Sequence, residues 1–256
     1  MNHFNLIGTY TLCKREIWRF AKVWNQTVIA PVVTTLLFLA VLTLAMGGAE
    51  RVIDGVPYSQ FVAPGLIMMA VVQNAFANTS SSLILAKIQG VIIDILMPPL
   101  TGSEITLAMA IGGIARGLSV GVVVLASVYV FVPFTLHSFW LAVFYVVASS
   151  IMMALLGVLA GVWSNGFDQL SAITNYIVTP LAFLSGTFYS IKQLPEFWYW
   201  VCHINPFFYM IDGFRYAMTG YTDGTIITGM LVLTGINVVL WVATVWMFKK
   251  GYRLKT

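Results

Sequence analysis

The chain has 256 residues, of which 59% are hydrophobic and only 9% are charged, and its formal net charge is +4. Soluble domains contain about 45–50% apolar and about 25% charged residues, so this composition excludes an ordinary soluble protein and indicates a membrane protein. No basic stripe lies outside the hydrophobic stretches, which argues against a nucleic-acid partner.

The segment before the first apolar stretch has helical periodicity. Apolar side chains recur at three- and four-residue steps, while basic side chains share another face. The apolar positions are Tyr10, Cys13, Ile17, Phe20 and Trp24, and the basic ones are Arg15, Arg19 and Lys22. This pattern predicts an interfacial helix over residues 10–25, lying in the headgroup plane. Alternatively, the basic residues are only a topology anchor.

Six apolar stretches are long enough to cross a bilayer, which requires about 20 residues of helix. They are Val28–Met46, Phe61–Leu83, Ile105–Phe131, Phe139–Trp163, Leu170–Tyr189 and Ile226–Phe248. None alternates as the strands of a transmembrane barrel do. The sequence therefore predicts one all-α, polytopic membrane domain over residues 1–256.

Basic residues gather at both ends of the chain, which sets the expected orientation. The leader carries four, Lys14, Arg15, Arg19 and Lys22, and the tail carries Lys249, Lys250, Arg253 and Lys255. Because Lys and Arg favour the cytoplasmic side, both termini are expected in the cytoplasm. An even number of crossings follows, and six satisfies it.

Residues 86–99, between the second and third expected spans, are predicted to form a short cytoplasmic helix. It carries Lys87, Gln89 and Asp94, and Pro98 and Pro99 stop it. Its apolar run from Val91 to Met97 is too long for a solvated loop and requires a covering surface. A docked cytoplasmic protein would supply that surface. The alternative is that this helix lies in the membrane interface.

Residues 192–221 are apolar but interrupted by Pro195, Pro206 and Gly213, so each piece is too short to cross. Broken apolar helices at membrane depth must be buried in protein or line a cavity. The segment is therefore expected to form a hairpin that dips back into the outer leaflet. Within it, Asp212 and Arg215 are spaced to pair on one helical face. The pair either locks the hairpin or contacts substrate.

Arg116 is the clearest charge inside an expected span, about 15–18 Å along the helix from Glu104. Intramembrane charges are functional candidates by default, although snorkelling or a structural pair would also explain this one. The second span carries a polar streak that either lines a path or bonds between helices. It comprises Gln73, Asn74, Asn78, Thr79 and Ser80–Ser82.

Small residues at four-residue steps predict close helix contacts. They are Gly113, Gly117 and Gly121 in the third span, and Gly157 and Gly161 in the fourth. Pro180 is expected to kink the fifth span.

The sequence has no GxxxxGK[ST] loop, so it predicts no phosphate-loop nucleotide site in this chain. No catalytic or metal-binding set converges, and we expect neither catalytic residues nor a cofactor or metal. Two other classes of function stay open. One is a membrane-embedded enzyme acting on lipid substrates, with Arg116 or Asp212 in a polar site, and the other is a passive anchor or channel.

Several motifs resemble the permease subunits of type-2 ATP-binding-cassette exporters of bacteria. The resemblance covers essentially the whole chain. It is carried by QFVAPGLIMMAVVQNAFANTSSS (residues 60–82), LMPPLTGSEI (96–105), GGIARG (112–117), TPLAFLSGTFYSIKQLPEFW (179–198) and INPFFYMIDGFRY (204–216). The Gly-x-Phe-Tyr, Leu-Pro and Asn-Pro succession is the most specific part.

This resemblance implies a transport subunit in the bacterial cytoplasmic (inner) membrane. Two permeases would pair as a homodimer surrounded by membrane lipid, and two separate cytoplasmic ATPase subunits would bind ATP and Mg. The coupling helix of the family would lie near Ala86–Met97, and the leader helix near Tyr10–Trp24 would also contact the ATPase. The exported substrate would be a lipid, a polysaccharide or lipid-linked glycan, or a hydrophobic drug.

These implications assign candidate roles to particular residues. The ATPase-coupling candidates are Lys87, Gln89, Asp94, Arg15 and Arg19. Candidates for the substrate path or bundle interior are Arg116, Gln73, Asn74 and Asn78. Candidates in the outer hairpin are Asn205, Pro206, Asp212 and Arg215.

Overall fold

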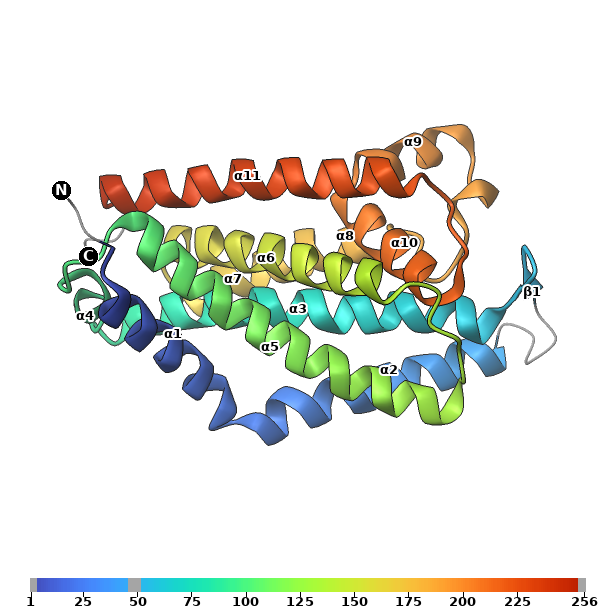
Figure 1. Cartoon of the computed structure of the whole chain (residues 1–256), viewed down its shortest axis with the longest axis horizontal. Coiled ribbons are helices and arrows are strands. Elements are labelled where there is room, and N and C mark those ends of the chain that lie inside the picture. Colours follow the sequence, from blue (N-terminus) through green and yellow to red (C-terminus); the bar gives the residue numbers. More distant parts are fainter. Residues whose placement is uncertain (1–3, 46–51, 253–256) are drawn as a thin grey trace.

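The computed structural model describes residues 4–45 and 52–252, and it is a bundle of long helices (Figure 1). The long helices are α2 (Trp24–Ala45), α3 (Tyr58–Ile88), α5 (Gly102–Phe131), α6 (Phe139–Trp163) and α11 (Ile226–Lys250). Within the described ranges, these 5 helices are long and apolar enough to cross a membrane. The prediction of an all-α polytopic protein is confirmed. Met46, Arg253 and Lys255, named above, lie outside the described residues.

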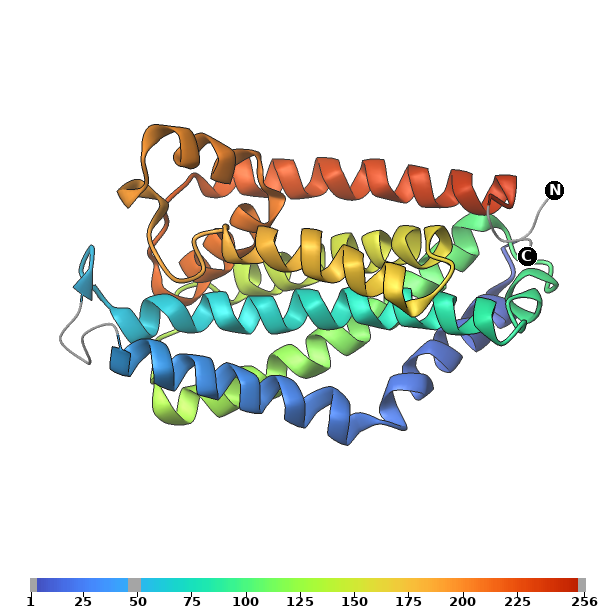
Figure 2. The ribbon, with the colours of Figure 1, turned by 180° about the vertical axis from the view of Figure 1, so that it is seen from behind.

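The fifth expected span is a composite of three shorter segments. It consists of α7 (Phe167–Ile173), the π-helix η2 (Thr174–Val178) and α8 (Thr179–Phe183). These segments follow one another as a single rod beside α3 (Figure 2). At 1.5 Å per residue the rod is about 25 Å long, a little shorter than a hydrocarbon core. In place of a simple kink, a wide π turn precedes Pro180, whose ring cannot fit against the carbonyl four residues earlier in a regular helix.

Helix α3 forms the centre of the bundle and is buried along most of its length between α5 and α6. Glycines make these contacts close, as predicted. A Cβ added at Gly157 would lie 2.5 Å from the Phe76 carbonyl oxygen, and one at Gly113 would lie 2.5 Å from Ala154 Cβ. Thr79 Oγ1 adds a 2.7 Å hydrogen bond to the Ala154 carbonyl oxygen across the same contact.

The connections gather at two opposite ends of the bundle (Figure 1). One end, called the α4 end below, holds the start of α1 (Leu6–Ala21), the short α4 (Ile93–Leu96) and the end of α11. The other, called the α10 end, holds α9 (Glu196–Ile204) and α10 (Pro206–Thr219). It also holds the two-stranded hairpin of β1 (Val52–Ile53) and β2 (Val56–Pro57).

The leader differs from the predicted helix over residues 10–25. Helix α1 ends at Ala21, and after a short turn α2 already begins at Trp24. The predicted apolar face is also divided, because Tyr10, Ile17 and Trp24 are exposed whereas Phe20 is buried. The buried strip of α1 consists of Thr9, Leu12, Glu16 and Phe20, and it packs on α5. The hydrophobic pattern of the sequence did not identify Glu16 as buried, because a carboxylate is not expected on the side of a helix that packs against its neighbours.

The predicted helix over residues 86–99 is also corrected. Helix α3 continues through Ile88 because no breaker precedes Gly90, which adopts a left-handed φ of 73°. Only Ile93–Leu96 is helical beyond it, so Lys87 belongs to the last turn of α3 and Gln89 follows its end.

Residues 192–221 form the expected broken hairpin. It comprises the 3-10 turn η3 (Ile191–Gln193), α9 (Glu196–Ile204) and α10 (Pro206–Thr219), with breaks at Pro195 and Pro206. Gly213, predicted as a break, lies inside α10 instead. Its missing side chain makes room for the ring of Tyr145 on α6. Helix α10 packs against α3, α6 and α11 and is largely buried.

Candidate functional site

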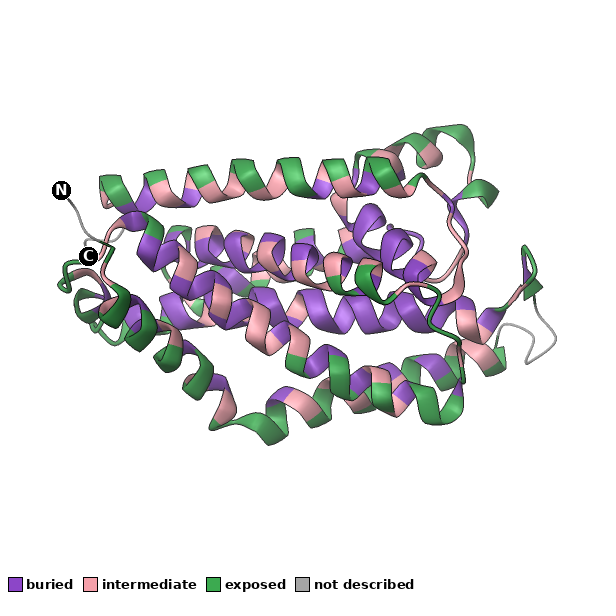
Figure 3. Cartoon of the chain, viewed as in Figure 1, coloured by how far each residue is buried: buried purple, intermediate pink, exposed green. Residues whose placement is uncertain are grey.

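The α4 end presents an exposed apolar surface on a buried anchor. Ile92 and Ile95 are buried among side chains of α1, α3, α5, α6 and α11. The side chains around these two isoleucines are exposed and include both apolar and polar residues. We call this set the docking surface: Gln89, Val91, Ile93, Asp94 and Met97. Met97 is 77% exposed. Figure 3 shows this exposure at the tip of the bundle next to α1. The buried Ile92 and Ile95 thus fix the position of the loop that carries the exposed residues.

Lys87, predicted to couple to an ATPase, is turned into the bundle and is only 8% exposed. Its ammonium group donates to the carbonyl oxygens of Val162 at 2.8 Å and Ser164 at 2.6 Å. Lysines commonly satisfy the last carbonyls of a helix in this way. Lys87 therefore ties the end of α3 to the end of α6 and lies apart from the docking surface, which differs from its predicted place.

Arg15 and Arg19, both predicted to contact an ATPase, have different surroundings. Arg15 is exposed on α1, whereas Arg19 turns toward α3. The Arg19 guanidinium donates to Asn78 Oδ1 at 2.9 Å, to the Asn78 carbonyl oxygen and to Ser81 Oγ at 3.1 Å. Only Arg15 has the exposure that a partner contact needs.

Glu16 completes this polar cluster between α1 and α3. It is fully buried, its Oε2 lies 3.4 Å from Arg19 Nε, and its Oε1 accepts a 2.8 Å hydrogen bond from Ser82. A Cβ added at Gly112 of α5 would lie 2.6 Å from the Glu16 Cβ, so α1 and α5 are in close contact here. We call Glu16, Arg19, Asn78, Ser81 and Ser82 the α1–α3 cluster. Asn78 belongs to it and is 0% exposed.

Arg116 pairs with the polar streak of α3. Its Nε and Nη2 donate to Asn74 Oδ1 at 3.2 and 3.1 Å, and Asn74 Nδ2 donates to the Ala70 carbonyl oxygen at 2.9 Å. Gln73 and Asn74 line two adjoining hollows that also share Thr179, one beside α7–η2–α8 and one beside α2. Their volumes are about 550 and 490 Å³. We call the two hollows together the polar groove. Arg116 does not line the groove but is hydrogen-bonded to Asn74, which does.

At the α10 end, Arg215 is fully buried and joins four segments. Nε donates to the Phe61 carbonyl oxygen at 3.1 Å and Nη2 to the Gly186 carbonyl oxygen at 2.6 Å. Nη1 lies 4.0 Å from both Asp212 and Asp223, and the guanidinium carbon lies 3.9 Å from the centroid of the Phe61 ring. Burial lowers the pKa of Arg215 from its usual value, against the opposing effect of the two carboxylates.

The two carboxylates are themselves held by the loop after α10. Asp212 accepts from the Asp223 and Gly224 backbone N–H groups at 2.8 and 3.0 Å and from the Thr222 hydroxyl at 2.6 Å. Asp223 accepts from Ser190 at 2.6 Å and from Tyr221 at 2.7 Å. Burial is also the main reason that the pKa of the Tyr221 hydroxyl is raised. We call this network, centred on Arg215, the α10 lock.

Asn205 and Pro206 begin α10 and tie it to the fifth span. The Asn205 side chain accepts from the Phe207 N–H at 3.1 Å and donates to the Leu181 carbonyl oxygen at 2.7 Å and Ser185 Oγ at 2.9 Å. Pro206 occupies the first turn, where its missing N–H costs no hydrogen bond.

Sequence reasoning missed Glu16 and Asp223. Both are among only nine acidic residues in the chain, and Glu16 stands three residues before Arg19, a signal that pairing rules recognise. The backbone acceptors of Arg215 had no sequence signal, because carbonyl groups are identical at every residue.

The fold and these sites define an all-α polytopic membrane protein with a polar groove in the bundle and an apolar loop at one end. The sequence matches the ABC-2 type transporter family over residues 8–219, and the chain belongs to that family. It is 36% identical to the inner membrane transport permease YadH of Escherichia coli K12, over 100% of both chains. It is also 23% identical to nodulation protein J of Sinorhizobium fredii NGR234, over 78% of this chain and 79% of that protein. Nodulation protein J of Rhizobium leguminosarum bv. viciae is 24% identical over 77% of this chain and 78% of the relative.

Proposed function

We propose that this chain is the permease subunit of an ATP-driven exporter in the bacterial inner membrane. It works as a pair of identical chains, and two separate ATPase subunits bind ATP and Mg on the cytoplasmic side. The α4 end faces the cytoplasm in this arrangement, and the α10 end faces outward. The transported molecule is a lipid, a lipid-linked glycan or other polysaccharide, or a hydrophobic drug.

The docking surface is the observation that supports this proposal most directly. A soluble loop does not expose Val91, Ile93 and Met97 without a partner to cover them. Ile92 and Ile95 pack the loop against α1, α3 and α11, so a displacement of the loop would displace several helices together. An ATPase subunit bound there would move the bundle through this rigid contact.

The polar groove supports an assignment of the substrate path. It runs between α2 and α7–η2–α8, and Gln73, Asn74 and Thr179 line both of its halves. The outward surface of α2 is apolar and exposed, and it includes Ile29, Val33, Leu37 and Val41. A second copy placed against α2 and α8 would close the groove into a path between the two chains. Amide and hydroxyl side chains alternate with apolar ones along this lining, which suits an amphipathic substrate.

The test is co-purification from cells that express the chain with its genomic neighbours. We expect an ATPase subunit to accompany the wild-type permease and Met97→Asp to abolish that association, because a carboxylate would be buried in an apolar contact. Leu136→Asp is the matched control, since Leu136 is exposed in the loop at the opposite end. A wild-type protein that purifies without any ATPase subunit, or an intact complex with Met97→Asp, would overturn the proposal.

A further inference from the structure

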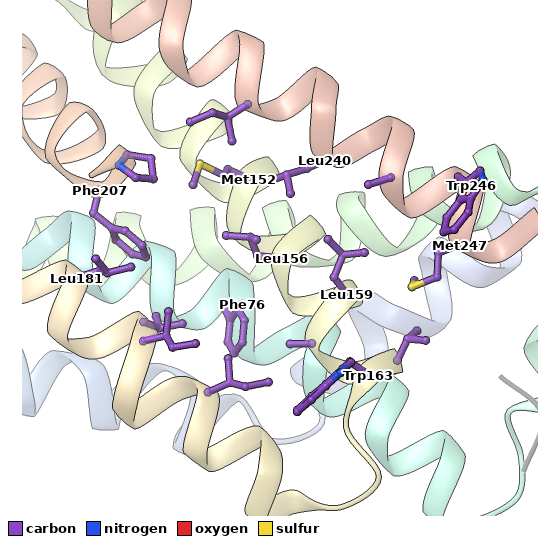
Figure 4. Close-up of a pocket in the computed structure, with 18 of the residues that line it drawn as sticks. Phe76, Met152, Leu156, Leu159, Trp163, Leu181, Phe207, Leu240, Trp246 and Met247 are labelled. Carbon is purple, nitrogen blue, oxygen red and sulfur yellow. The ribbon is translucent and has the colours of Figure 1, made fainter. Parts of the chain in front are cut away.

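A long apolar groove lies on the side of the bundle between α6, α7–η2–α8 and α11. Its volume is about 800 Å³, and its lining is contributed mainly by aliphatic and aromatic side chains. Figure 4 shows it running from Phe207 and Leu181 at one end to Trp163, Trp246 and Met247 at the other. None of the lining residues carries a charge. The groove adjoins the polar groove, which contains Gln73 and Asn74, and the two share only Phe76 and Val178 in their linings.

The end of the groove near Trp246 has the features of a membrane–water interface. Trp163 and Trp246 flank it from α6 and α11 and are 49% and 53% exposed. Tryptophan rings prefer the headgroup level of a bilayer. The ammonium group of Lys250 lies 4.6 Å from the centroid of the Trp246 ring, which places a positive charge at this end of the groove. Lys249 is its exposed neighbour.

We propose that this groove binds an acyl chain of an anionic phospholipid, whose headgroup phosphate is held at Lys250. We call it the lipid groove. The apolar lining would contact the acyl chain of the lipid. The ammonium group of Lys250, at the Trp246 end, would favour a negatively charged headgroup. The bound lipid would fill the space between α11 and the rod of α7–η2–α8. It is a resident component of the permease, distinct from the transported substrate, and its binding does not depend on an ATPase partner.

A second groove on the opposite side of α11 provides an internal comparison. It lies between α5, α6 and α11, has a volume of about 560 Å³, and is lined by Val238, Trp241 and Val242 of α11 among others. Ala243 lines the lipid groove, whereas the adjacent Val242 lines this second groove. Substitutions at two neighbouring positions therefore fill different grooves.

The experiment is native mass spectrometry of the detergent-purified protein, followed by titration of delipidated protein with phosphatidylglycerol and phosphatidylcholine of identical chains. We expect wild type to retain phospholipid and to prefer phosphatidylglycerol. Ala243→Phe should lose the retained lipid, and Val242→Phe should keep it. Lys250→Gln should weaken phosphatidylglycerol binding by about fivefold, in line with one basic residue near an anionic headgroup. Phosphatidylcholine binding should weaken less, because the choline cation already offsets its phosphate, so the preference for phosphatidylglycerol should largely disappear.

Three results would overturn this proposal. The first is equal lipid retention by Ala243→Phe and wild type at equal thermal stability. The second is a headgroup preference that survives Lys250→Gln. The third is disulfide cross-linking of Ala243→Cys between two chains in native membranes, which would assign the groove to a contact between permeases. Lys250→Gln alters an exposed side chain, so its result does not depend on how well Ala243→Phe folds.

Discussion

The guanidinium of Arg215 on α10 donates a 3.1 Å hydrogen bond to the carbonyl oxygen of Phe61 on α3 and lies over the ring of the same residue. This contact fixes the broken hairpin to the central helix of the bundle. The side chain also reaches Gly186 in the loop after α8 and approaches Asp212 and Asp223. The geometry supports a locking role for the pair of Asp212 and Arg215, because their polar atoms are directed at neighbouring protein segments.

Replacing Arg215 should therefore destabilise the folded protein. Arg215→Met leaves the buried Asp212 without its cation and Asp223 with only the half-exposed Lys192, and breaking a buried ion pair in this way costs about 3–5 kcal/mol. Arg215→Lys should also be less stable than wild type, because an ammonium group cannot reproduce the planar fork that reaches Phe61 and Gly186. The measurement is thermal unfolding of the purified protein in detergent.

Lys192→Gln is the control for the α10 lock, since the Lys192 side chain is 50% exposed and lies 3.8 Å from Asp223. It should leave the unfolding midpoint nearly unchanged, as exposed ion pairs contribute little. Wild-type stability of Arg215→Met together with defective transport would contradict the locking role and favour substrate contact.

Much of the bundle could be predicted from the sequence because lipid imposes simple rules on helix length and composition. The predicted and observed bounds of α6 coincide at Phe139 and Trp163, and α11 begins at the predicted Ile226. The fifth span was harder to predict. Whether the segment before Pro180 bends or widens into a π turn depends on tertiary contacts that hydropathy does not encode.

The polar sites were predicted less completely than the helices. Arg116, Asn74 and Asp212 stand out because charges and amides are rare in apolar surroundings. The sequence could not show which of them meet, since Arg116 reaches Asn74 across 42 positions of the chain and Arg215 reaches Phe61 across 154. Lys87 was misplaced because the end of α3 could not be located from the sequence alone.

Close packing at Gly157 should be sensitive to a single methyl group. A Cβ there would meet the Phe76 carbonyl oxygen and the Thr79 hydroxyl, so Gly157→Ala should destabilise the protein by about 1–3 kcal/mol through overpacking. Gly235→Ala is the matched control, because no atom lies within 4 Å of its added Cβ. Alanine is a better helix former than glycine by about 1 kcal/mol, so this control should keep or raise the unfolding midpoint. Equal midpoints for the two variants would contradict the close contact of α3 and α6.

Glu16 and Arg19 should be energetically coupled. Arg19→Gln leaves the buried Glu16 carboxylate without its partner, Glu16→Gln leaves the partly exposed Arg19 without its carboxylate, and the double variant removes both charges. The double-mutant cycle should give a coupling energy of about 0.5–3 kcal/mol in thermal or denaturant unfolding. Lys14→Gln on the exposed part of α1 is the control and should show no coupling with Glu16→Gln. Strict additivity of the Glu16 and Arg19 changes would show that their ion pair contributes nothing to the attachment of α1.

Reversing the charge at Asp94 should weaken coupling to an ATPase subunit without affecting membrane insertion. Asp94 is exposed on the docking surface, in the first turn of the four-residue helix α4. We expect Asp94→Lys to lower the permease-stimulated ATPase activity of the reconstituted complex. Glu196→Lys introduces the same change in charge at the exposed start of α9, at the opposite end of the bundle, and should leave the activity unchanged. Unaltered stimulation by Asp94→Lys would place the docking contact elsewhere.

Arg116 should matter more for transport than for assembly. Its hydrogen bonds to Asn74 position an amide that lines both halves of the polar groove, so Arg116→Ala frees that amide without altering the groove wall directly. We expect the variant to insert and to bind its ATPase subunit normally but to export substrate more slowly in reconstituted vesicles. Asn74→Leu should give a similar transport defect, and the double variant should be no worse than either single change, because both act through one contact. Normal export by Arg116→Ala would show that Arg116 has only a packing role. Additive transport defects of Arg116→Ala and Asn74→Leu would show that Arg116 affects the substrate path independently of Asn74.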